Sequence, residues 1–64
     1  MDVKRLKVLI AKQQLTIEGL AIKAGVSADV IYKTLAGKRT PNLATVGKIA
    51  AALDVDPGEL MQED

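Results

Sequence analysis

The chain of 64 residues contains no cysteine and no histidine. Without cysteine it can form neither a disulfide nor a thiolate metal site. Without histidine it lacks the side chain that most often binds metal ions and acts as a base near neutral pH. No pair of acids combines with a nucleophile at a spacing that would place them on one face. We therefore expect no metal, no cofactor and no enzymatic activity.

Long apolar stretches are also missing. No uncharged apolar run approaches the roughly 20 residues that a membrane-spanning helix needs. The first residues, "MDVKRLKVLIAK", lack the small-residue cleavage site of a signal peptide. A chain this short has room for one domain, spanning residues 1–64, and a domain of this size buries only about 60% of its unfolded surface. We expect a modestly stable cytoplasmic domain with no membrane partner.

The charges are unevenly distributed, although the net charge of the whole chain is only +1. All nine basic residues lie in residues 1–48 together with three acids, so this part carries a net charge of +6. Residues 49–64 contain five acids and no basic residue, which gives −5. The basic part could face a polyanion.

The hydrophobic pattern is helical throughout. Apolar residues recur at spacings of three and four, and nowhere do they alternate with period two over a useful length. An all-α bundle of five helices and no sheet is therefore expected. The predicted helices cover residues 3–13, 17–24, 28–36 and 43–53, with a fifth, very short helix beginning at residue 57.

Capping residues mark the helix ends. Gly25 can adopt the positive φ that ends the second helix, and Gly37 ends the third. Between Gly25 and the next cap only a tight turn remains. In "DPGEL", Pro57 at the first helical position and Glu59 at the third resemble a capping box. The predicted N-caps are Thr16, Ser27, Asn42 and Asp56.

The second and third predicted helices have the pattern of a helix-turn-helix. Ala21 is small, as a close crossing of the two helices requires, and Gly25 allows the chain to turn. Ile31 fills the core beneath the third helix. A small all-α bundle could show these three residues by chance, so the pattern alone leaves function open.

Further residues make the chain resemble a known family. The turn "GVS", the continuation "GKRTPNLATVGKIAAALDV" and the closing "DPGELM" resemble the Cro/CI-type (XRE-like) helix-turn-helix DNA-binding family over residues 6–61. The resemblance implies a compact domain of the lambda-repressor-like type from a prokaryote or phage. Its third helix would enter the major groove of double-stranded DNA, and it would regulate transcription, chiefly by repression. A pseudo-palindromic operator and a homodimer that is weak in solution and can depend on DNA are also implied, with no small molecule.

The resemblance implies two sets of contact residues. The base-reading set would be Ala28, Asp29, Tyr32 and Lys33. The phosphate-binding set would be Thr16, Ile17, Ser27, Lys38, Arg39, Thr40 and Asn42.

Helical geometry agrees with the base-reading set. Ile31 and Leu35 point inward and Val30 partly so, which leaves residues 28, 29, 32, 33 and 36 on the outer face. In the major groove a lysine can donate to guanine O6 or N7, and an aspartate can accept from the N4 amino group of cytosine. Alanine can contact the thymine methyl group.

Each of these side chains also has a purely structural interpretation. Asp29 lies in the first turn of its helix, where the helix dipole favours a carboxylate with or without DNA. Lys33 could be a solvated surface lysine. Lys38 and Arg39 could stabilise the C-terminal end of the same helix. Tyr32 could pack its ring on the helix surface, hydrogen-bond a phosphate, or stack on a sugar or base edge.

Ile17 departs from the family pattern, in which the first residue of this helix is commonly a glutamine that bridges the DNA backbone and the third helix. That clamp is absent here. A second hypothesis is therefore a helix-turn-helix scaffold that reads little DNA and serves as a protein-interaction module of an antitoxin-like kind.

Overall fold

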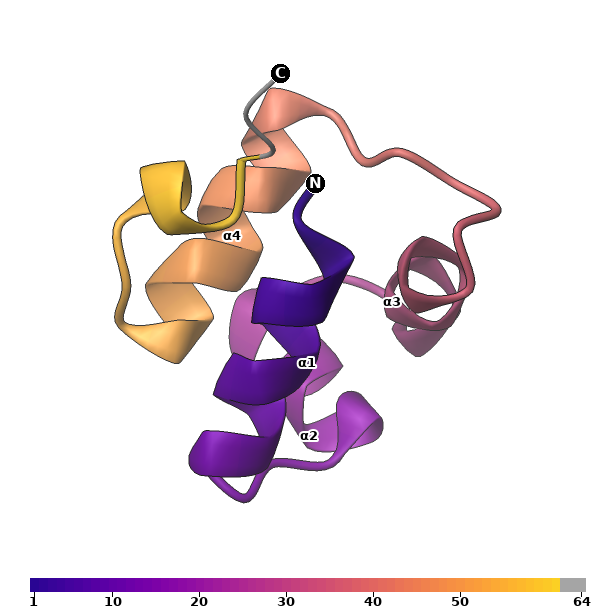
Figure 1. Cartoon of the computed structure of the whole chain (residues 1–64). Helices are drawn as coiled ribbons and strands as arrows, with labels where there is room; N and C mark the ends of the chain where they lie inside the picture. Colours follow the sequence, from indigo (N-terminus) through magenta and orange to yellow (C-terminus); the bar gives the residue numbers. More distant parts are fainter. Residues whose placement is uncertain (62–64) are drawn as a thin grey trace.

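Four α-helices and one short 3-10 helix make up residues 1–61, the part of the chain that this computed structural model describes (Figure 1). No strand occurs in these residues. None of the helices in this range combines the length and the apolar character needed to cross a bilayer. The elements are α1 (Val3–Lys12), α2 (Ile17–Ala24), α3 (Ala28–Leu35), α4 (Leu43–Leu53) and η1 (Pro57–Glu59).

The all-α prediction is confirmed, but the count of five helices is wrong. Residues Pro57–Glu59 form one 3-10 turn, in which the Leu60 N–H donates to the Pro57 carbonyl at 3.0 Å. Asp56 caps it by accepting from the Gly58 N–H at 2.8 Å. The cap chemistry predicted the start of this turn correctly, and the fully buried Leu60 follows it as its C-cap.

The other predicted helix starts are confirmed. Thr16, Ser27 and Asn42 each accept a hydrogen bond from the backbone N–H three residues on, at 2.9, 3.4 and 2.8 Å. Gly25 and Gly37 have φ values of 73° and 74°, which a residue with a Cβ adopts only at a cost. α1 and α3 end one residue earlier than predicted, because Gln13 and Ala36 act as their C-caps.

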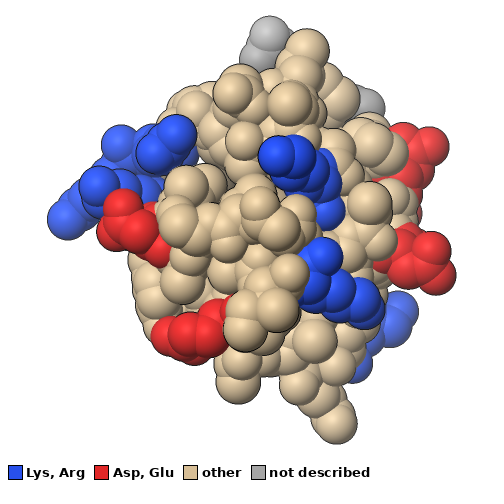
Figure 2. All heavy atoms as spheres, turned by 180° about the vertical axis from the view of Figure 1, so that it is seen from behind, with Lys and Arg blue, Asp and Glu red and all other residues tan. Residues whose placement is uncertain are grey.

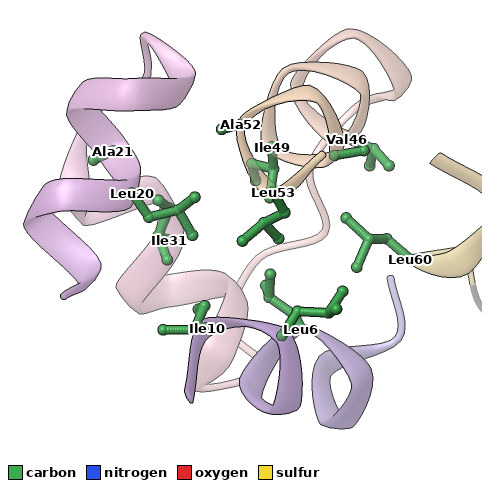
Figure 3. Packing of buried hydrophobic residues seen from close by; sticks show 12 residues of the cluster. Leu6, Ile10, Leu20, Ala21, Ile31, Val46, Ile49, Ala52, Leu53 and Leu60 are labelled. Carbon is green, nitrogen blue, oxygen red and sulfur yellow. The ribbon is translucent and has the colours of Figure 1, made fainter. Parts of the chain in front are cut away.

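One apolar core joins the four α-helices and Leu60, the residue that follows η1. Figure 3 shows side chains of α1, α2, α3, α4 and the segment after η1 converging on the same interior. The start of α1 is also tied to the segment after η1, since the Asp2 N–H donates to the Leu60 carbonyl at 2.7 Å. The fully buried large apolar side chains are Leu6, Leu20, Ile31, Ile49, Leu53 and Leu60.

The inner face of α3 differs in one respect from the sequence prediction. Ile31 is fully buried, as expected, but its partner in the core is Thr34, which is 1% exposed. Thr34 avoids an unpaired hydroxyl by donating to the Val30 carbonyl at 2.7 Å. Leu35 is only half-buried and packs at the edge of the core.

One glycine inside α4 could be replaced to raise the stability of the domain. A Cβ at Gly47, inside α4, would meet no other atom within 4 Å. Gly47→Ala should therefore raise the free energy of unfolding by about 0.5–1 kcal/mol, because alanine loses less backbone entropy in a helix. Urea denaturation followed by circular dichroism measures the change.

Gly19→Ala is the matched control. Its Cβ would lie 2.9 Å from Thr16 Oγ1, so the N-cap of α2 would have to shift. This substitution should give a smaller gain than Gly47→Ala, or a loss. Equal stabilisation by the two substitutions would contradict the packing described for them.

Candidate nucleic-acid interface

The predicted helix-turn-helix core is present between α2 and α3. Ala21 is 4% exposed and Ile31 is fully buried, and the two helices pack against each other. Gly25 turns the chain, while the Val26 N–H donates back to the Ala21 carbonyl at 3.0 Å. These contacts fix the orientation of α3 relative to α2.

With its inner face in the core, α3 presents the opposite face to solvent. Asp29, Tyr32, Lys33 and Ala36 are exposed, as the sequence predicted. Ala28 is only half-buried and packs partly against the core, so less of it is available than expected. In Figure 1, α3 lies at one edge of the molecule, where no other helix covers its outer side.

Two of the predicted base-reading residues form an ion pair. Lys33 Nζ lies 3.1 Å from Asp29 Oδ2, one helical turn away, and both side chains are at least half exposed. Pairs of this kind stabilise a helix by only about 0.3–0.5 kcal/mol. The pair therefore orients both side chains and can open at little cost when another charged partner approaches.

Tyr32 forms a contact that the sequence did not predict. Its hydroxyl donates to Glu18 Oε2 at 2.5 Å, which joins the outer face of α3 to the first turn of α2. This hydrogen bond lowers the pKa of Glu18, because it stabilises the carboxylate, and raises the pKa of Tyr32. Glu18 was absent from the predicted site. The two residues are 14 positions apart, so only the crossing of α2 and α3 brings them together.

The basic loop that follows α3, residues 37–42, exposes every residue except the buried Pro41. Lys38, Arg39 and Thr40 all face solvent, and neither Lys38 nor Arg39 makes an ion pair within residues 1–61. The Lys38 backbone N–H donates to the Lys33 carbonyl at 2.9 Å and so satisfies the end of α3. The side chains are left free to reach a partner outside the chain.

The remaining predicted phosphate contacts lie at helix starts. Thr16, Ser27 and Asn42 use a side-chain oxygen to accept the capping hydrogen bond, which leaves the hydroxyl or amide hydrogens available as donors. Ile17 is half-buried and packs against the core, so its side chain supports α2.

The charged side chains are as unevenly distributed on the surface as they are along the sequence. In Figure 2 the molecule is seen from behind, so α3 lies toward the left edge, where basic side chains gather with acidic side chains directly beside them. A separate group of acidic side chains occupies the opposite edge. The face that carries α3 is thus basic but not uniformly so.

Comparison with known proteins identifies this arrangement. Residues 5–62 match the family model of the Cro/C1-type helix-turn-helix DNA-binding domain. No match was found among the curated proteins or the solved structures. The matched range includes α2, the turn, α3, α4 and η1. The resemblance inferred from the sequence is therefore confirmed, and the chain belongs to the family of Cro/C1-type helix-turn-helix DNA-binding domains.

Proposed function

We propose that this domain binds double-stranded DNA in a sequence-specific way, with α3 in the major groove, and represses transcription by occupying an operator in the cytoplasm. The observation that carries the proposal is the division of α3 into two faces. One face is locked into the core by Ile31, while Asp29, Tyr32 and Lys33 project from the other beside the exposed basic loop. The major groove, about 12 Å wide, admits one α-helix.

The base-reading residues would each recognise a different chemical group on the bases. Lys33 is suited to guanine O6 or N7, and Asp29 to the N4 amino group of cytosine. At a matching base pair, Lys33 and Asp29 would leave each other and each would bind a base. At a mismatched site the Asp29 carboxylate would remain near the phosphates and repel them. Ala28 retains enough exposure for contact with a thymine methyl group.

Phosphate contacts would position the domain on the duplex. Lys38, Arg39 and Thr40 supply the exposed loop, and Ile17 supplies its backbone N–H at the start of α2. The cap residues Thr16, Ser27 and Asn42 supply the donor hydrogens that capping leaves unused.

A second copy of the chain would bind the other half of a two-fold operator, as is usual for domains that read DNA with one helix. Apolar surface supports this part of the proposal. Leu43 is 73% exposed and Met61 45%, and both line a shallow hollow with Pro41 and Leu60. Selection of a binding site from randomised duplex would reveal both the half-site and the spacing between two half-sites.

Exposed apolar residues also keep the second candidate function open. Ile22 on α2 is 83% exposed and has no role in the DNA contacts proposed above. Together with the acidic C-terminal part of the sequence, residues 49–64, it would suit a protein-interaction module of the antitoxin-like kind. Salt dependence separates the two functions, because binding to DNA releases condensed counterions and binding to a protein does not.

Affinity for a random duplex should fall steeply as salt rises. The logarithm of the association constant should change with the logarithm of salt concentration with a slope of about −0.9 for each phosphate neutralised. Fluorescence anisotropy at several salt concentrations gives the slope. Replacing both Lys38 and Arg39 with alanine should make the slope about 2 less steep. Absence of salt-sensitive duplex binding at low ionic strength would favour the interaction module.

Lys33→Ala and Lys38→Ala should have different effects on specificity. If Lys33 reads guanine, its removal should reduce the preference at one operator position by about 1–3 kcal/mol. Lys38→Ala should weaken binding to all sequences alike, because Lys38 contacts phosphate. Competition binding against single-base operator variants distinguishes the two. An unchanged preference in Lys33→Ala would remove Lys33 from the base-reading set.

Asp29→Asn should tighten binding to random duplex and blur specificity at one base pair. The substitution removes the phosphate repulsion of the carboxylate and replaces an acceptor with a group that can also donate. Affinities for operator and random duplex, measured in parallel, give the specificity ratio. If the ratio is unchanged, Asp29 serves only the helix dipole and its ion pair with Lys33.

A further inference from the structure

The hydrogen bond between Tyr32 and Glu18 fixes the polarity of a side chain on the proposed DNA-reading face. We infer that Glu18 is a specificity-determining residue, which positions Tyr32 and occupies its only hydroxyl hydrogen. Tyr32 would then present only an acceptor to the major groove and read an exocyclic amino group, N6 of adenine or N4 of cytosine. This inference rests on the proposed function and assigns one position of the operator to a class of bases.

The direction of the hydrogen bond follows from the chemistry of the two groups. A tyrosine hydroxyl has one hydrogen to donate, and an ionised carboxylate can only accept. With that hydrogen directed at Glu18 Oε2, the lone pairs of Tyr32 Oη are all that it can offer to a third group. A hydrogen bond to a charged acceptor is also stronger than one between neutral groups, which favours its retention.

The surroundings of Glu18 keep this arrangement in place. Glu18 lies in the first turn of α2, where the helix dipole favours a carboxylate, and the Thr16 cap holds that turn. Within residues 1–61, the carboxylate of Glu18 forms no ion pair with a lysine or arginine. Its only side-chain partner in that range is Tyr32, which is 47% exposed and so remains accessible from outside.

An acceptor at this position discriminates among the groups that DNA presents. In the major groove the amino groups of adenine and cytosine are donors, whereas guanine N7 and O6 and thymine O4 are acceptors. Phosphate oxygens are acceptors as well, and the Glu18 charge repels them. Tyr32 is therefore poorly suited to a phosphate contact, so among the roles that the sequence left open this inference favours contact with a base.

The test compares four proteins in selection from randomised duplex: wild type, Tyr32→Phe, Glu18→Ala and the double variant. Wild type should prefer adenine or cytosine at one position contacted by Tyr32. Tyr32→Phe should lose about fivefold of that preference, the worth of one typical hydrogen bond. Glu18→Ala frees the hydroxyl hydrogen, so Tyr32 can then donate as well as accept, and guanine or thymine should become tolerated at the same position.

The double variant shows whether Glu18 affects base preference by positioning Tyr32 or only through its own charge. Without the hydroxyl, removal of Glu18 should leave the base preference of Tyr32→Phe unchanged and should only tighten binding to random duplex. Glu59→Gln, which removes an acid on η1, serves as the control and should leave the base preference at that position unchanged. Circular dichroism verifies that each variant is folded.

The outcomes also separate this inference from the function on which it rests. If wild type selects no sequence, the proposed function fails. If wild type selects a sequence and both single variants keep its preference at every position, the role of Glu18 and Tyr32 is refuted while sequence-specific binding stands.

Discussion

The burial of Ile31 is the constraint on which the rest of this structure depends. Ile31 is fully buried beneath α3, and Thr34, which satisfies its own hydroxyl within the helix, completes the inner face. Because the period of an α-helix is fixed, seating this face in the core determines which residues point outward. The side chains that can meet DNA are thus selected by packing on the other side of the same helix.

α2 supports α3 in two ways. Through Leu20 and Ala21 it supplies part of the core on which α3 packs (Figure 3). Through Glu18 it reaches the exposed face of α3 and holds Tyr32. The first contact sets the position of a helix and the second sets the hydrogen-bonding polarity of a single side chain. A domain of this size has little stability to spare, so the polar caps at its helix starts matter for folding. Their oxygens accept the capping hydrogen bonds, which leaves their hydrogens free for the phosphate contacts proposed above.

Much of the fold and part of the site could be predicted from local pattern. The N-caps and the turn at Gly25 depend on neighbours within a few residues, as does the outward orientation of Asp29 and Lys33. The ion pair of these two was foreseeable from their spacing of four, although it was not predicted. The count of five helices was wrong because a capping residue specifies where a helix begins and does not specify whether α-helical turns follow; here a single 3-10 turn follows. The contact of Glu18 with Tyr32 lay beyond prediction, since it depends on the crossing of two helices.

The central claim is that the outer face of α3 and the basic loop after it form the DNA-binding surface. The most direct measurement is the change in backbone amide chemical shifts when a selected operator duplex is added to isotopically labelled protein. We expect the largest changes on the outer face of α3, on the loop containing Lys38 and Arg39, and at the start of α2. Changes confined to residues 49–61, which include η1, would contradict this DNA-binding surface.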